Sequence, residues 1–512
     1  MPSKLSTATV CRMFLILLVL SEGQWICGAN CAAGPDDNIL NTAAADDSVP
    51  VVLPAALTTV LDHTQPLINP RLGRLPLYVL PISGCLSVLP EAAAEEQLRL
   101  LDARGIGYTV DWHPAAFRES LAEGLRIARL QQKIGQPVAV HATACLQGFC
   151  DGSAETLHID EAGTRFADHS CGGALGCPFA LQHRIPVIRQ QVEQFVQAYQ
   201  DAGLTIDFIF ADWEIDGPIE WNESRAASMK CVTCRSHVPD LSDFRKYQSA
   251  LRIIRSQLQR EAFAQPVTQR FPKALVGNYG VCPHDGYRYW YDYFEKTASD
   301  EMPFVADQKA RYREWYPEFP ETEYTFAMPV VYTWYPTFGW YNFDSPDYRW
   351  FYNMLKEASS VGANTSGQTP LIPFVHWHTT APPESPDPNV IQMSPAAYQD
   401  LLWHMLLRGH DTFFLWCMPN ELGEEIRLVH EVYRDSLQYA EFLTAGEPLN
   451  FDVPSQPDTI VSGLRLGNQA LVRRSEYATK APLSNVSLKT KTGPEAEFIL
   501  PPVTGNQVIS SK

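Results

Sequence analysis

The sequence predicts an α/β fold: a (β/α)8 barrel followed by a small β-rich extension. Two observations lead to this prediction. Segments with helical spacing separate successive apolar runs, and polar side chains gather where those runs end. An open doubly wound sheet shows the same alternation. No glycine-rich phosphate turn follows the first run, however, so the barrel is preferred to that fold. We expect no cofactor. Eight short apolar runs are present, at residues 77–82, 106–112, 137–143, 206–212, 274–280, 325–333, 371–377 and 412–417.

Helical periodicity is clearest between the third and fourth runs. Ile188, Val192, Phe195 and Tyr199 fall on one face of a helix, and Pro186 suits its first turn. Other helices are expected near residues 90–103, 115–132, 241–258, 346–361, 395–408 and 422–444.

Two connections are too long to be simple turns. They span about residues 144–184 and 215–240, after the third and fourth runs. Long loops in compact domains are often functional. Both are expected at the carboxyl ends of the strands, where they would wall a site.

The first residues, 1–29, have the pattern of a secretory signal peptide. Lys4 and Arg12 precede a short apolar stretch, and the small residues Gly28 and Ala29 follow it. The stretch is too short to cross a bilayer. We therefore expect a secreted or periplasmic protein that is not inserted in a membrane after the signal is removed.

The composition and residue pattern divide the rest of the chain into three parts. Residues 30–72 form a polar, proline-rich lead-in, and residues 73–446 form the predicted catalytic barrel. Residues 447–512 contain alternating, glycine-broken pieces, which predict a small β-rich C-terminal domain.

Composition narrows the classes of partner. The chain of 512 residues has 45% hydrophobic and 19% charged residues, which is ordinary for a globular protein. A net charge of −18 with no basic tract argues against nucleic acid. Aromatic residues reach 11%, with 12 Trp and 21 Tyr, and suit a surface on which sugars stack. The expected partner is an oligo- or polysaccharide.

The fourth run carries the main catalytic candidates. Its apolar residues end abruptly in Asp212, Trp213 and Glu214. Alternate residues of a strand point to the same side, so the two carboxyl groups should lie roughly 6–7 Å apart. Carboxyl groups that close influence each other, and one tends to remain protonated near neutral pH. The pair therefore predicts a general acid with an assisting carboxylate, although two solvated loop acids are the alternative.

Polar and aromatic residues at the other strand ends should converge on the same site. Carboxylates ringed by aromatic residues, with few cations, describe a carbohydrate site better than a phosphate site. The expected substrate-binding residues are Asp111, Trp112, His141, Asn278, Tyr279, Trp334, His376, Trp377, His378, Trp416 and Glu421.

These motifs resemble those of TIM-barrel glycoside hydrolases of the chitinase-like and hyaluronidase-like group. The stretch FIFADWE is similar to their fourth-strand signature in its closing D-W-E. AMPVVYTW resembles the strand that offers a catalytic tyrosine, and FFLWC resembles the strand whose tryptophan floors the sugar pocket. Phe208 and Phe210 stand where the chitinase pattern has Gly and Asp, and hyaluronidases act on a polyanion. The resemblance therefore implies a mechanism but not a particular substrate.

What the resemblance implies is substrate-assisted hydrolysis of a 2-acetamido sugar. Glu214 would protonate the glycosidic oxygen, and Asp212 would orient the acetamido group that attacks the anomeric carbon. Tyr332 would hydrogen-bond that group, and Trp416 would stack under the sugar. Without a 2-acetamido group a second carboxylate must act as nucleophile or base, and the candidates are Asp111 and Glu421.

Two other classes of function remain open. One is a carbohydrate-binding barrel without catalysis, whose usual mark is loss of the acid that Glu214 supplies here. The other is a metal-dependent (β/α)8 hydrolase. His376 and His378 share one side of a strand, a spacing that can ligate a metal together with His141 or Asp212. The preferred interpretations of these histidines are contacts with sugar hydroxyls or ordinary hydrogen bonds within the protein, so no metal is assigned to the strand ends.

The cysteines form three close pairs within the two long connections. An exported chain usually pairs such cysteines as disulfides, so we expect bridges that staple the connections. The three pairs are Cys145 with Cys150, Cys171 with Cys177, and Cys231 with Cys234. The alternative is a structural zinc site with four cysteine ligands, namely Cys171, Cys177, Cys231 and Cys234.

Overall fold

A computed structural model describes residues 51–167, 176–213, 224–278, 315–380, 387–477, 485–489 and 496–511. The predicted signal peptide and residues 30–50 of the lead-in lie outside these ranges. Among the described residues, no helix is both long and apolar enough to cross a membrane.

Each of the eight apolar runs contains a strand that pairs in parallel with its neighbours. The second run holds two strands, β2 and β3, with only Tyr108 between them. The bounds are β1 Leu77–Val79, β2 Ile106–Gly107, β3 Thr109–Asp111, β4 Ala139–Ala142, β7 Phe208–Ala211, β8 Leu275–Asn278, β9 Val330–Trp334, β10 Phe374–Thr380 and β11 Phe414–Leu415.

These strands form two parallel sheets. One has the order β2-β1-β11-β10-β9, and the other has the order β3-β4-β7-β8. The register places Val140 beside Ile209 and Ile209 beside Val276. The predicted α/β class is confirmed, and the ladders do not show closure of the two sheets into one barrel.

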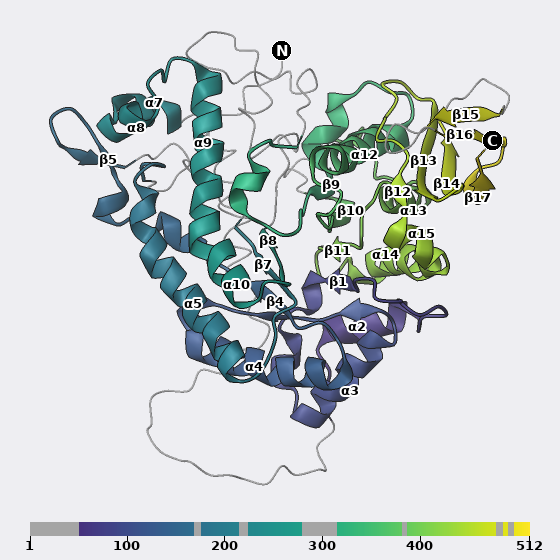
Figure 1. Ribbon diagram of the computed structural model, residues 1–512, viewed down its shortest axis with the longest axis horizontal. Helices are drawn as coiled ribbons and strands as arrows, with labels where there is room; N and C mark the ends of the chain where they lie inside the picture. Colours follow the sequence, from purple (N-terminus) through teal and green to yellow (C-terminus); the bar gives the residue numbers. More distant parts are fainter. Residues whose placement is uncertain are drawn as a thin grey trace.

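Helices follow most of the strands, as the periodicity predicts (Figure 1). Ser345 and Ser394 cap two of them, since each hydroxyl accepts a hydrogen bond from an N–H of the first turn and a proline follows. The bounds are α2 Ala55–His63, α3 Glu91–Asp102, α4 Phe117–Ile134, α5 Ile185–Asp201, α7 Ser224–Lys230, α8 Val232–His237, α9 Phe244–Gln259, α10 Gln265–Arg270, α12 Pro346–Asn364, α13 Pro395–Leu406, α14 Leu422–Ser436 and α15 Ala440–Ala445.

The lead-in is more ordered than its composition suggests. It contains α2, which packs against α14. Leu57 and Val60 on this helix are fully buried in the main core. Their burial explains why a short segment with few helix signals is held in place, since tertiary packing supplies most helical stability.

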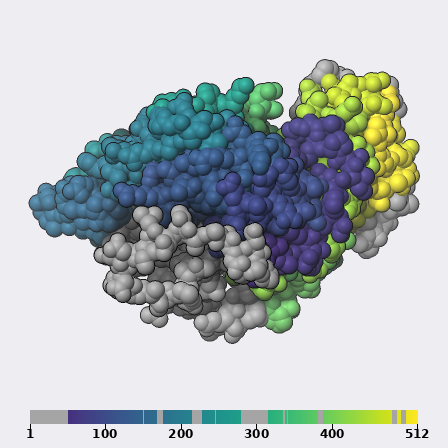
Figure 2. Space-filling view, turned by 90° about the horizontal axis from the view of Figure 1, so that it is seen from below, coloured from purple at the N-terminus to yellow at the C-terminus, as the bar shows by residue number. Residues whose placement is uncertain are grey.

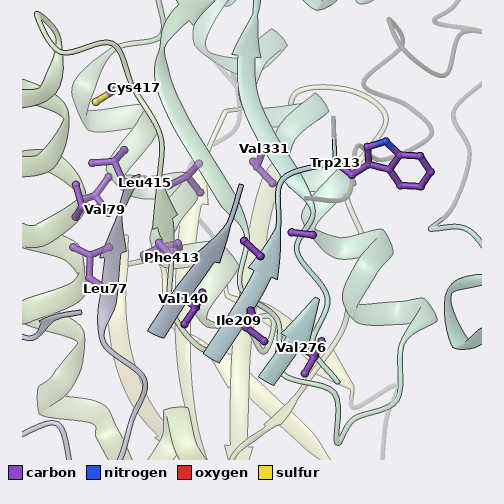
Figure 3. Close-up of a cluster of buried hydrophobic side chains, with 14 of the residues drawn as sticks. Leu77, Val79, Val140, Ile209, Trp213, Val276, Val331, Phe413, Leu415 and Cys417 are labelled. Carbon is purple, nitrogen blue, oxygen red and sulfur yellow. The ribbon is translucent and has the colours of Figure 1, made fainter. Parts of the chain in front are cut away.

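The alternation of side chains along the strands creates two cores. Phe208 and Phe210 of β7 lie in a mostly aromatic core with Phe374 and Phe414 from the other sheet. We call the strand face that contributes to this core the inner face. Ile209, between the two phenylalanines, belongs instead to the core shared with the helices, which defines the outer face. Figure 3 shows outer-face residues of several strands, among them Leu77, Val79, Val140 and Val276.

The C-terminal residues form an antiparallel sheet of four strands in the order β12-β13-β14-β17, with a separate hairpin of β15 and β16. This part, coloured yellow, lies at one end of the molecule (Figures 1 and 2). Gly467 adopts a positive φ of 63° in the tight turn between β13 and β14. The bounds are β12 Glu447–Pro448, β13 Thr459–Leu466, β14 Gln469–Glu476, β15 Val486–Lys489, β16 Glu497–Leu500 and β17 Gly505–Ser510.

A buried polar network joins this sheet to α13. The two ring nitrogens of His404 each lie 2.8 Å from a serine hydroxyl, that of Ser462 on β13 and that of Ser475 on β14. Arg408 donates to the same Ser462 hydroxyl and to the backbone carbonyl of Asp452. Burial lowers the pKa of His404 to about 3 and that of Arg408 to about 9.

Candidate active site

Three polar side chains predicted for the site meet at the ends of β3, β4 and β7. Asp111 and His141 are register partners on adjacent strands, and Asp212 follows the last residue of β7. All three lie on the inner face, because each is two positions beyond an inner-face residue such as Ala139 or Phe210. The ring of His141 stacks on Phe210 with centroids 4.6 Å apart, so the aromatic core forms the floor of this cluster.

His141 bridges the two carboxylates. Its Nδ1 lies 3.1 Å from Oδ1 of Asp111, and its Nε2 lies 3.7 Å from Oδ2 of Asp212. The Ser83 hydroxyl donates to the same oxygen of Asp111. Thr143 Oγ1 lies 3.0 Å from Nδ1 of His141. The histidine is nearly buried, whereas each carboxylate keeps more than a quarter of its side chain exposed.

The electrostatics of the cluster favour a protonated histidine. Burial by itself lowers the pKa of His141, but contacts with Asp111 and Asp212 outweigh it and raise the pKa to about 9. Burial raises the pKa of Asp111, and the hydrogen bond from His141 more than reverses that effect and lowers it. At neutral pH the arrangement is therefore one imidazolium held between two carboxylates.

A second cluster lies at the ends of β9, β10 and β11. The rings of Tyr332 and Trp416 stack with centroids 5.5 Å apart, and Trp416 meets His376 edge-on at 4.7 Å. Tyr332 also lies 6.0 Å from Phe374 of the aromatic core. Tyr332, Trp416 and His376 occupy inner-face positions, as predicted for residues that would contact a sugar.

Glu425 is a buried acid of this cluster that the sequence analysis missed. It accepts hydrogen bonds from the Trp377 backbone N–H at 2.6 Å and from His378 at 3.1 Å, and its Oε2 lies 3.0 Å from Nδ1 of His376. A usable signal existed, because Glu425 falls on the apolar face of α14 between Leu422 and Ile426.

The groups of this second cluster shift one another's pKa values. Burial raises the pKa of Glu425, but the charge of His376 and the hydrogen bonds it accepts outweigh burial and lower the pKa. Burial likewise lowers the pKa of His378, and its hydrogen bond to Glu425 and the nearby charge of Glu421 raise it overall. Glu421, predicted as a site residue, therefore acts on the cluster through its charge.

Three predicted substrate-binding residues point away from the site. Trp112 is fully buried and stacks on Phe195 of α5 at 4.1 Å. Trp377 donates its indole N–H to the Met393 carbonyl beside α13. Asn278 accepts from the Trp213 backbone N–H at 2.9 Å and donates to Gln259. The prediction was wrong for these three residues for one reason. Each lies one position away from an inner-face residue, so its side chain faces the helices.

Glu214, Tyr279 and Cys171 lie outside the described residues. The backbone of Trp334 ends β9, where it pairs with Thr380 of β10. Trp213, just before Glu214, is buried and projects away from the strands (Figure 3), so Asp212 and Trp213 follow the alternation that the D-W-E pattern requires.

None of the predicted disulfides is present among the described residues. Cys145, Cys177, Cys231 and Cys234 are all buried thiols, as are Cys85 and Cys417. Each sequence pair contains at least one of these thiols, so none of the three expected bridges is formed. The expectation was wrong, since Cys177 lies instead against Cys234 of the other long connection, with Sγ atoms 3.4 Å apart, too far for a disulfide.

Comparisons with known proteins give only distant likenesses. No protein-family model matches the chain, and no curated protein sequence matches it. Bee venom hyaluronidase is similar at 14% identity over 62% of this chain and 93% of its own, with a TM-score of 0.30. Isomaltulose synthase from Klebsiella sp. LX3 is similar at 9% identity over 86% and 99%, with a TM-score of 0.41. Alpha-galactosidase I from Mortierella vinacea is similar at 11% identity over 81% and 83%, with a TM-score of 0.34. TM-scores this low carry no argument about this protein.

Proposed function

We propose that the protein is an exported glycoside hydrolase that cleaves O-glycosidic bonds of an oligo- or polysaccharide. The observation that carries the proposal is the Asp111–His141–Asp212 cluster at the strand ends. Asp212 is two positions before Glu214, and both belong to the D-W-E motif. Two clusters of acids, one with an aromatic pair, offer what a neutral polyhydroxylated substrate requires: hydrogen-bond partners and a stacking surface.

In this proposal Glu214 is the general acid and Asp212 the assisting carboxylate. His141 would hold the Asp212 side chain in place, and Glu214 would give its proton to the glycosidic oxygen. With a 2-acetamido sugar, Asp212 would orient the acetamido group while its carbonyl attacks the anomeric carbon. Tyr332 and Trp416 would hold the sugar ring.

We also propose that the two parallel sheets close into one (β/α)8 barrel of residues 73–446. At one junction the run from β2 to β3 belongs to both sheets and is broken only at Tyr108. At the other junction, the Thr325 N–H donates to the carbonyl of Val276 on β8, and Ala327 forms a parallel bridge with Leu371. Closure would set the two polar clusters over the shared aromatic core, facing one another.

The experiment is hydrolysis of a panel of aryl glycosides, with and without a 2-acetamido group, by the wild type and by Glu214→Gln. Losing a general acid should lower turnover on the order of 10²–10⁴-fold. Glu441→Gln is a matched control, because Glu441 is an exposed acid on α15. The control should retain wild-type turnover.

Each outcome separates the candidate functions. Turnover of 2-acetamido substrates alone supports the substrate-assisted mechanism. Turnover of plain glycosides supports a hydrolase in which another carboxylate, such as Asp111 or Glu421, acts as the nucleophile or base. Sugar binding without turnover favours a non-catalytic carbohydrate-binding barrel. Loss of activity with a chelator and its return with zinc would favour a metal-dependent hydrolase.

A further inference from the structure

Four potential metal ligands converge at a distance from the strand-end clusters. They are His158, Cys177, Cys231 and Cys234, and all four are buried. One ligand atom from each residue lies within 4.8 Å of every other. The ligands come from three separate segments: the hairpin of β5 His158–Ile159 and β6 Arg165–Phe166, the turn after residue 176, and the start of α8. Figure 1 shows β5, α7 and α8 gathered at one corner of the molecule.

The distances suit a shared metal ion better than a disulfide. Sγ of Cys177 lies 3.4 Å from Sγ of Cys234 and 3.9 Å from Sγ of Cys231. A disulfide requires about 2.05 Å. A tetrahedral zinc ion with Zn–S bonds of about 2.3 Å separates its sulfurs by about 3.8 Å. Nδ1 of His158 lies 3.8 Å from Sγ of Cys234, close to the roughly 3.6 Å that the same geometry gives for a sulfur and a nitrogen.

Two of the thiols lie close together at the start of one helix. Cys231 is the N-cap residue of α8, and Cys234 lies in its first turn. This Cys-x-x-Cys spacing at a turn is typical of structural zinc sites. Four ligands of the Cys₃His type leave no open position, so the site would be closed and structural rather than catalytic.

The other two ligands are held by contacts between distant segments. The Cys177 N–H donates to the Thr156 carbonyl at 2.6 Å. Gly176 allows this approach, since a Cβ there would lie 2.4 Å from the same carbonyl oxygen. His158 stacks on Phe166 across the hairpin at 5.1 Å, and its Nε2 is buried with no hydrogen-bond partner among the described residues. Nδ1, the ring nitrogen nearest the thiols, is therefore the atom that would bind the ion.

We propose that these four residues bind one structural Zn²⁺ ion. Soft thiolates with one imidazole select zinc over hard cations such as Mg²⁺ and Ca²⁺. The ion would fasten the connection after β4 to the connection after β7, which begins at Asp212 and Glu214. Zinc would thereby hold the wall of the candidate active site without taking part in the chemistry. The proposal does not depend on the proposed hydrolase activity.

The test is the zinc content of the purified full-length protein, measured by mass spectrometry of the metal. We expect about one zinc per chain in the wild type and almost none in Cys234→Ala or His158→Ala. Cys145→Ala is the matched control, because Cys145 is another buried free cysteine that lies outside the group. This control should retain the zinc.

Two further measurements keep the test decisive if a variant fails to fold. Wild type exchanged into Co²⁺ should show the visible absorption of a tetrahedral thiolate site and the sulfur-to-cobalt charge-transfer band. A strong chelator should lower the wild-type melting temperature, and added Zn²⁺ should restore it. Wild-type protein without metal, or a disulfide among Cys177, Cys231 and Cys234 in non-reducing mass spectrometry, would overturn the proposal.

Discussion

His141 and His404 are two nearly buried histidines whose ring nitrogens are both engaged, yet their pKa values shift in opposite directions. His141 lies between two carboxylates, and its pKa is raised to about 9. His404 lies between two serine hydroxyls, with the charge of Arg408 nearby, and its pKa is lowered to about 3. Burial acts on both in the same sense, so the partners decide the charge.

The difference separates the candidate active site from the buried joint between α13 and the C-terminal sheet. At the strand ends a cation and two anions are kept together in contact with solvent, where a polar substrate can reach them. At the joint between α13 and the C-terminal sheet, hydroxyl partners satisfy a neutral imidazole in a closed interior. The two regions should therefore respond differently to substitution and to pH.

The largest expected effect is on turnover, from Asp212→Asn. The variant keeps the shape of the side chain but removes one of the two charges beside His141. Activity on the best glycoside should fall on the order of 10²–10³-fold, because a preorganised charge near the reacting centre is lost. The His141 pKa, followed by NMR titration, should fall below about 9. Asp62→Asn, at an exposed position on α2, is the control. Near wild-type turnover of Asp212→Asn would remove this carboxylate from the mechanism.

The next effect is on stability in acid, through His404. Its pKa is lowered by folding, so protonation favours the unfolded chain, and stability is lost as pH falls below the ordinary histidine value of about 6.5. Between pH 6.5 and 4 the wild type should lose about 3 kcal/mol of unfolding free energy relative to His404→Gln. Denaturant unfolding at a series of pH values measures this difference. A difference that does not vary with pH would show that His404 is not buried in its neutral form.

His141 should show the opposite slope. Its pKa is raised by folding, so its stabilising effect is complete below about pH 6.5 and is lost as pH rises through about 9. Over that window the advantage of the wild type over His141→Gln should shrink by about 2–3 kcal/mol, allowing for the solvent that reaches both carboxylates. The same unfolding series, continued to pH 10, measures it. An advantage that grows with pH would contradict the proposed charge state.

The smallest effects should come from a pair of tryptophans on opposite strand faces. Trp416→Phe should raise KM several-fold, about 1 kcal/mol of lost stacking, with little change in stability. Trp377→Phe should leave KM unchanged and cost about 1 kcal/mol of stability, since it loses the hydrogen bond to Met393. Kinetics and unfolding of both variants test whether the alternation assigns these residues correctly. A KM effect confined to Trp377→Phe would reverse the assignment of faces.

Local patterns in the sequence were enough to locate the strands and the larger helices. A buried parallel strand is an apolar run bounded by polar residues, and a helix repeats its apolar residues every three or four positions, so both are visible within a short window. The same window located Asp212 at the end of its strand. Alternate residues of a strand face opposite sides, and this rule, applied to every strand, would also have assigned Trp112 and Trp377 to the outer face.

Contacts between distant segments were decided only by the tertiary structure. Glu425 joins His376 and His378 across about fifty positions, and His158, rather than a fourth cysteine, meets the three thiols from the two long connections. The pKa values of His141 and His404 differ for the same reason, because a neighbour supplied from another strand or helix sets the local field. The sequence alone determined which chemical groups were available and at which strand ends. Folding determined which of them face one another, because electrostatic and hydrogen-bond energies depend on distances that no local pattern encodes.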